Sequence, residues 1–215
     1  MEEAGKTTLM RIHEAAVAEF MEKGFQKASL RNIVKSAGVT TGAFYGYYGS
    51  KEELFDALVV ETYEHFTNEY KASVRAFEML PIEEQPDHMG NAGHDCMIEM
   101  LEYSFDHKDA CHLILQCSEG TKYENLVDDL SEIEVDATRR FCEVLKKLGH
   151  EVPVIDSRLE HILVTGMMNA YFEIMIHDVP KEDALRYVEE LNAFYTAGWE
   201  RIMGGKFKNS PQKRM

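Results

Sequence analysis

The chain has 215 residues, of which 45% are hydrophobic, so it is long and apolar enough to bury a core as one large helical domain or two smaller domains. Only five prolines occur and no strand-like alternation recurs, so an all-α fold is expected. The net charge of −15 argues against a nucleic-acid partner for the chain as a whole, because phosphates attract lysine and arginine.

The charge is unevenly distributed. Residues 6–51 hold seven basic and three acidic residues, a net charge of +4, and the remainder carries −19. A basic head on an acidic body would bind a polyanion in one orientation only, although chance clustering on a solvated face is the alternative. The N-terminus has no apolar stretch typical of a signal peptide, and residues 162–176, the longest apolar stretch, are too few to span a bilayer. We therefore expect a cytoplasmic protein with free thiols and no membrane partner.

Three helices are predicted in the first 50 residues, over 8–23, 29–38 and 40–48. In each, apolar residues recur at the three- and four-residue spacing of one helical face. These residues are Leu9, Ile12, Ala16 and Phe20, then Leu30, Ile33, Val34 and Ala37, then Phe44 and Tyr48. Gly24 and Gly38 follow the first two helices, where glycine favours a sharp stop.

The third predicted helix leaves Thr41, Gly42 and Tyr45 facing outward. A helix, a glycine turn and a second helix with a free face form the helix-turn-helix plan, in which the second helix enters the DNA major groove. Glycine and tyrosine are poor helix formers, and their presence is explained if backbone and hydroxyl groups approach a phosphate-lined surface. Few of these side chains can form a bidentate hydrogen bond with a base edge. Sequence specificity is therefore expected to depend on contacts with thymine methyl groups and on DNA shape.

A capping box marks the start of a fourth helix. Ser50 and Glu53 have the spacing at which each side chain bonds the other's backbone N–H. Lys51 lies in the first turn of this helix, beside free N–H groups, so the sequence predicts an anion site suited to a DNA phosphate. Tyr45 and Lys51 are the phosphate contacts that we expect most strongly.

The run ASLRNIVKSAGVTTGAFYGY over residues 28–47, followed by YGSKEEL, resembles the DNA-binding domain of the TetR family of bacterial regulators. The resemblance extends over residues 8–60, and Tyr48 stands where the family usually has Phe. It implies that the DNA contacts are Ser29, Arg31, Thr40, Thr41, Gly42, Tyr45, Tyr47 and Lys51. The alternative is that Ser29 and Thr40 serve only as caps, that Arg31 is merely solvated, or that Tyr47 packs beneath the head.

The remaining predicted helices cover residues 51–79, 92–105, 108–118, 123–148, 157–177 and 183–203, with a loop over 81–93. We therefore divide the chain into a DNA-binding domain over residues 1–50, with the helix-turn-helix at about 28–47, a helical effector-binding and dimerisation domain over 51–205, and a basic tail over 206–215 that we expect to be disordered.

The helix over 157–177 is more apolar than one buried face requires, which favours a two-fold dimer in which two helices of each chain form a four-helix bundle. An ordinary core helix is the alternative. The TetR resemblance implies the dimer, which would place two heads on half-sites about 34 Å apart. The expected interface residues are Leu159, Ile162, Leu163, Gly166, Ala170 and Ile174.

The middle of the chain is rich in methionine, cysteine, histidine and tyrosine. The resemblance implies that these helices enclose a pocket for a small organic effector, although such residues more often form core. The expected lining is Met97, Met100, Tyr103, His107, Cys111, Met167 and Tyr171. His107 and Cys111 have a spacing usable for metal ligation, but no CxxC or HExxH pattern occurs, so neither a metal nor a cofactor is expected.

Together these features predict a ligand-responsive transcriptional regulator. We expect a repressor that binds a palindromic double-stranded DNA operator as a homodimer and is released by an unidentified small molecule. Two alternatives stay open: a regulator that senses metal or thiol oxidation through the middle helices, and a cytosolic helical enzyme with Cys111 as nucleophile and His107 as base. The enzyme alternative leaves the basic head unexplained.

Overall fold

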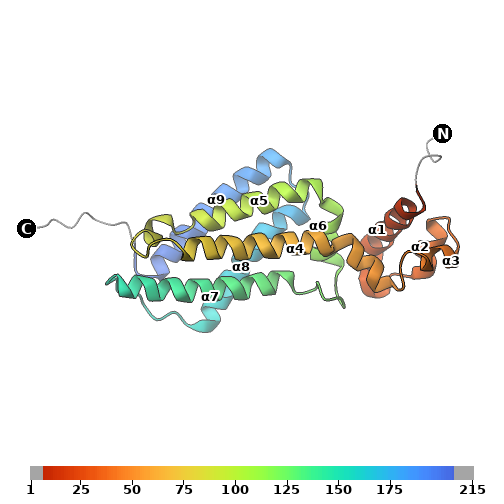
Figure 1. Cartoon of the computed structure of the whole chain (residues 1–215). Helices are drawn as coiled ribbons and strands as arrows, with labels where there is room; N and C mark the ends of the chain where they lie inside the picture. The colour runs from red at the N-terminus through yellow and green to blue at the C-terminus, as the bar shows by residue number, and fades with distance from the viewer. Residues whose placement is uncertain (1–6, 206–215) are drawn as a thin grey trace, which may run out of the picture. The chain divides into compact units, whose positions relative to one another are not determined.

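The structure, a computed structural model, describes residues 7–205 apart from the side chain of residue 92. The expected basic tail, with Lys206, Lys208, Lys213 and Arg214, lies outside the described residues. Within residues 7–205 the chain consists of helices and the turns between them, without a strand, which confirms the expected all-α fold (Figure 1).

The elements follow one another in the order α1 (Thr8–Lys27), α2 (Leu30–Ser36), α3 (Thr41–Tyr45), α4 (Lys51–Glu78), η1 (Gln85–His88), α5 (Asn91–Asp106), α6 (Lys108–Cys117), α7 (Leu126–Lys147), α8 (Ser157–Ile176) and α9 (Lys181–Ile202). Each predicted helix has a counterpart, with ends that differ by up to a few residues. The largest differences are in α1, which continues past a kink at Gly24, and in α3, which ends at Tyr45.

Internal contacts divide the described chain into two compact units. The first unit holds residues 7–65 and 107–126, and the second holds residues 66–106 and 127–205. The chain therefore passes between the units three times, whereas the sequence suggested one boundary after residue 50. Residues 107–126 join the first unit because α6 packs against α1, a pairing between segments far apart in the chain.

An aromatic cluster forms the core of the first unit. The rings of Phe20 and Phe25 each meet Phe55 edge-on, at centroid distances of 5.1 and 5.2 Å, an arrangement that aromatic quadrupoles favour. Ile12 and Phe44, from α1 and α3, are also fully buried. Most of the apolar residues predicted for α1 and α3 are thus buried in this unit, and Phe20 joins the start of α4 through the ring of Phe55.

The second unit is a helical bundle in which α5, α8 and α9 pack against one another (Figure 1). Phe66 of α4 is fully buried and lies 6.2 Å from the ring of Phe172 on α8, while Met100 and Met168 have no exposed surface. Among the described helices, none combines the length and the apolar character that crossing a membrane requires.

Candidate functional site

A left-handed glycine sets the turn between α2 and α3. Gly38 has a φ of 63°, a conformation that costs an L-residue energy and that glycine adopts freely. Thr40 then caps α3, since its hydroxyl oxygen accepts the Ala43 N–H at 3.1 Å. The predicted helix-turn-helix geometry is therefore present, with α3 as its second helix.

The outer face of α3 is open. Thr41, Gly42 and Ala43 are exposed, and Tyr45 and Tyr47 expose 55% and 49% of their surface, which is large for aromatic residues. Because Tyr47 is exposed, it does not pack beneath the head. The face thus presents hydroxyl groups, a bare backbone and two amphipathic rings to the outside.

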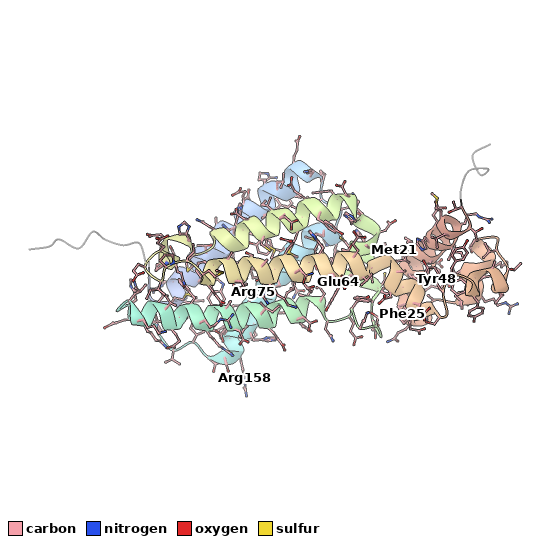
Figure 2. All side chains as sticks on the ribbon, in the orientation of Figure 1. Met21, Phe25, Tyr48, Glu64, Arg75 and Arg158 are labelled. Atoms are coloured by element: carbon pink, nitrogen blue, oxygen red, sulfur yellow. The ribbon has the colours of Figure 1, made fainter. Side chains whose placement is uncertain are left out.

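Tyr48 links α3 to α1 (Figure 2). Its ring packs against Phe44 at a centroid distance of 6.0 Å, and its hydroxyl group hydrogen-bonds Nε2 of His13. Burial lowers the pKa of His13 and raises the pKa of Tyr48, which favours a neutral ring that accepts the hydroxyl proton. The residue that departs from the TetR pattern therefore gains a polar contact.

The start of α2 is held by the carboxylate of Glu19, which accepts the backbone N–H of Ser29. The hydroxyl of Ser29 makes no capping bond, while its backbone N–H donates to Oε1 of Glu19 at 3.0 Å. Asn32 and Lys23 also donate to the Glu19 carboxylate, and the backbone bond, followed by these side chains, lowers the pKa of Glu19. The Ser29 hydroxyl is therefore available to a ligand. Had it capped α2 as the sequence suggested, the hydroxyl would be occupied by that bond.

Lys51 is engaged within the chain. Its ammonium donates to the backbone oxygens of Phe25, Ala28 and Gln26 at 2.6, 3.1 and 3.3 Å and lies 4.4 Å from the centroid of the Phe25 ring. An ammonium has three donors, so these bonds use all of them. In this structure Lys51 fixes the start of α4 to the segment that ends α1, in place of the anion site expected from sequence.

The capping box forms in a shifted version. Ser50 accepts the Glu53 N–H at 3.1 Å, as expected, but the Glu53 carboxylate accepts the N–H of Gly49 at 2.6 Å. Both bonds satisfy backbone donors at the start of α4.

A cavity of about 140 Å³ lies within the second unit, between α4, α5, α7, α8 and α9. Of the residues expected to line an effector pocket, Met97, Met167 and Tyr171 line this cavity. Met100 has no exposed surface and packs in the core, Tyr103 lies against Phe66, and His107 and Cys111 belong to the first unit. The other lining residues include Tyr70, Phe77, Met89, Glu134, Phe141, Tyr195, Trp199 and Met203.

Sequence reasoning missed Glu134, although a signal was present. Along α7, Leu130, Thr138, Phe141 and Leu145 are buried, and with Glu134 after Leu130 they form a series of three- and four-residue steps along one face. An acidic residue within an apolar stripe indicates a buried polar site. Here it accepts a hydrogen bond from the Tyr70 hydroxyl at 2.6 Å.

The thiols and histidines of the middle helices do not gather into a metal-binding group within the part of the chain that the structure describes. Among residues 7–205, no group of three or more His, Cys, Asp or Glu side chains could hold a metal ion. The four cysteines are buried, and burial raises the pKa of Cys96 and of Cys111 to about 12. These two thiols are therefore protonated at neutral pH, which disfavours both metal sensing and oxidation.

An apolar surface lies on α8 and α9. Ile162 and Phe194 expose 64% and 70% of their surface, Leu159 exposes 47%, and Gly166 is also open. The two helices pack together, and the Tyr195 hydroxyl donates to the Gly166 carbonyl at 3.2 Å. Leu163 and Ala170 are half-buried, whereas Ile174 is buried within its own chain, because it faces the core side of α8.

Comparison with known proteins agrees with this geometry. Residues 12–58 match the model for bacterial regulatory proteins of the tetR family. Over 68 residues the chain is 37% identical to an uncharacterised HTH-type transcriptional regulator, YvdT of Bacillus subtilis, covering 32% of this chain and 35% of that protein. Over 80 residues it is 34% identical to the HTH-type transcriptional regulator TtgR of Pseudomonas putida, covering 37% and 38%.

Solved structures extend the likeness to both units as a fold. The TetR family regulator PfmR of Thermus thermophilus is similar over 93% of this chain and 97% of its own, with 21% identity and a TM-score of 0.55. A TetR-like regulator of Rhodococcus is similar over 87% and 94%, with 17% identity and a TM-score of 0.51. The sequence matches span only about a third of each curated relative and concern transcriptional regulators, so they lend no support to an enzyme. Residues 12–58 therefore form a helix-turn-helix domain of the tetR family of bacterial regulatory proteins.

Proposed function

We propose that the protein is a transcriptional repressor that binds a palindromic operator as a homodimer and leaves it when a small molecule occupies the cavity of the second unit. The open face of α3 carries this proposal, because neither its exposed hydroxyl groups and Tyr45 nor the exposed Tyr47 in the turn that follows is needed for packing of the helix. Since the protein acts on bacterial DNA, its place of action is the cytoplasm.

The proposed DNA surface combines phosphate contacts with a few groups near the bases. Ser29 has a hydroxyl that makes no capping bond at the start of α2, and Arg31, two residues further on, is exposed. The face of α3 is supplied by Thr41, Gly42 and Tyr45, with Thr40 at its start and Tyr47 in the turn that follows it. Tyrosine and threonine hydroxyls position a protein on phosphates, whereas the small residues let the backbone approach the groove closely.

Lys51 has a different proposed role. Its three intramolecular bonds make it a positioning residue that holds α4 against the end of α1. A phosphate contact by the same ammonium would require at least one of these bonds to break.

The apolar surface of α8 and α9 is proposed as the dimer interface, with a second copy of the chain as its occupant. Ile162 and Phe194 are too exposed for core residues, and Gly166 allows a facing helix to approach. Two-fold pairing of two helices from each chain forms a four-helix bundle and gives the two DNA-binding heads a defined separation.

The effector is proposed to act through α4, which contributes residues to both units and to the cavity. A ligand can shift the protein between operator-competent and incompetent states only through a difference in its affinity for them. Nearly complete release requires about 5 kcal/mol of that difference.

Sequencing of genomic fragments retained by the purified protein tests this function. The expected result is enrichment of DNA upstream of a few genes, with an inverted repeat whose half-sites lie about 10 base pairs apart or a multiple of that distance. Fragments recovered without any common sequence, or with unpaired half-sites, would overturn the proposed operator.

A further inference from the structure

Glu134 is the one charged side chain among the described residues that line the cavity. Its Oε2 atom accepts the Tyr70 hydroxyl at 2.6 Å, and the described residues provide no other hydrogen bond to it. A carboxylate has about four acceptor positions, so most of its capacity is unused. The unused capacity is available to a molecule in the cavity.

The protein supplies no direct counter-charge for this carboxylate. Glu134 takes part in none of the described ion pairs. The positive charge of Arg140 is felt by Glu134, but the Arg140 side chain binds the carboxylate of Glu78. Burial raises the pKa of Glu134, while the Tyr70 bond and Arg140 lower it. A carboxylate in an apolar site is costly unless it is paired, so a bound cation would relieve that cost.

The remaining walls suit an organic cation rather than a metal ion. Six aromatic side chains line the cavity: Tyr70, Phe77, Phe141, Tyr171, Tyr195 and Trp199. Aromatic faces attract ammonium groups, tryptophan most strongly, and the methionine side chains around them adapt to the shape of an apolar ligand. The volume of about 140 Å³ is close to that of an apolar cavity that holds benzene, about 150 Å³, which sets the scale of the ligand at one ring.

We propose that the cavity binds a lipophilic organic cation of about one aromatic ring, such as a protonated arylalkyl amine, with its ammonium group at Glu134 and its ring against the aromatic walls. An organic anion would place like charges together, and a neutral ligand would leave the carboxylate unpaired. That this cation is the effector rests on the function proposed above, whereas its binding to the cavity does not.

Trp199 lines the cavity and is the only tryptophan of the chain, so its fluorescence reports occupancy. The probes are benzylammonium, benzyl alcohol and phenylacetate, titrated into the full chain without DNA. Benzylammonium is expected to bind about tenfold tighter than benzyl alcohol, a difference typical of one charge-assisted contact, and phenylacetate is expected to bind least. In Glu134→Gln the preference for benzylammonium should disappear, while benzyl alcohol should bind as before.

Glu132→Gln is the matched control, because Glu132 lies on the same helix and is exposed. It removes the same charge and should leave all three affinities unchanged. Equal binding of benzylammonium and benzyl alcohol to the wild type, an equal effect of the two substitutions, or no response of Trp199 to any probe would each overturn the proposal. The wild-type comparison decides the matter even if Glu134→Gln fails to fold, and the absence of DNA separates this result from that of the operator experiment.

Discussion

His13 shows how one partly buried residue couples the stability of the head to pH. Burial lowers its pKa in the folded chain, so between the ordinary histidine pKa of about 6.5 and this lower value the unfolded chain binds more protons. The contribution of His13 to stability is therefore present above pH 6.5 and is lost as the pH falls through the folded pKa.

Urea unfolding of the wild type, His13→Gln and His161→Gln at several pH values measures this contribution. His13→Gln should flatten the fall in the free energy of unfolding between pH 7.5 and 5, because the titrating ring is gone. His161 is exposed and serves as control, so its replacement should leave the pH dependence of the wild type. Parallel curves for all three proteins would contradict the assignment.

Within the helix-turn-helix, replacing Gly38 and replacing Gly42 by alanine are expected to change the stability of the head in opposite directions. Gly38 has a positive φ, so Gly38→Ala is expected to destabilise the head by about 1–2 kcal/mol. Gly42 lies within α3, and a Cβ atom there would meet only the Thr40 hydroxyl, at 4.0 Å. Gly42→Ala is therefore expected to stabilise the head by about 0.5–1 kcal/mol while weakening DNA binding. Thermal unfolding of both variants checks the signs, and stabilisation by Gly38→Ala would exclude the left-handed turn.

Local patterns predicted the helices well but could not assign every side chain. The stripe through Ile12, Ala16 and Phe20 fixed the inner face of α1 because helical periodicity is a property of neighbouring residues. The sequence suggested a phosphate contact for Lys51 and did not reveal its bonds to backbone carbonyls. Those carbonyls lie more than 20 residues away in the chain, so they leave no local signal. The packing of α6 on α1 was missed for the same reason. Glu134 was also missed, but in its case a local signal existed, because an acidic residue within an apolar stripe is visible in the sequence.

At the scale of the whole molecule, two-fold pairing is the property on which recognition of two half-sites depends. Ile162→Asp or Phe194→Asp would place charges in the proposed interface, where burying each apolar side chain contributes about 1.5–3 kcal/mol. Both variants should behave in light scattering as single chains of 24.7 kDa, and the wild type should show twice that mass. Val154→Asp, at a side chain that is 97% exposed outside α8 and α9, should remain dimeric. Retention of the dimer by both interface variants would place the contact elsewhere.

Recognition of an operator by this protein requires the outer face of α3 to meet DNA. Fluorescence anisotropy with DNA enriched from the genome measures this most directly, comparing the wild type with Tyr45→Ala and with Tyr187→Ala, which truncates an exposed tyrosine on α9. Loss of one hydroxyl–phosphate bond, worth about 1 kcal/mol, should weaken Tyr45→Ala several-fold on every sequence and leave Tyr187→Ala unchanged. Equal affinity of Tyr45→Ala and the wild type for this DNA would contradict the account.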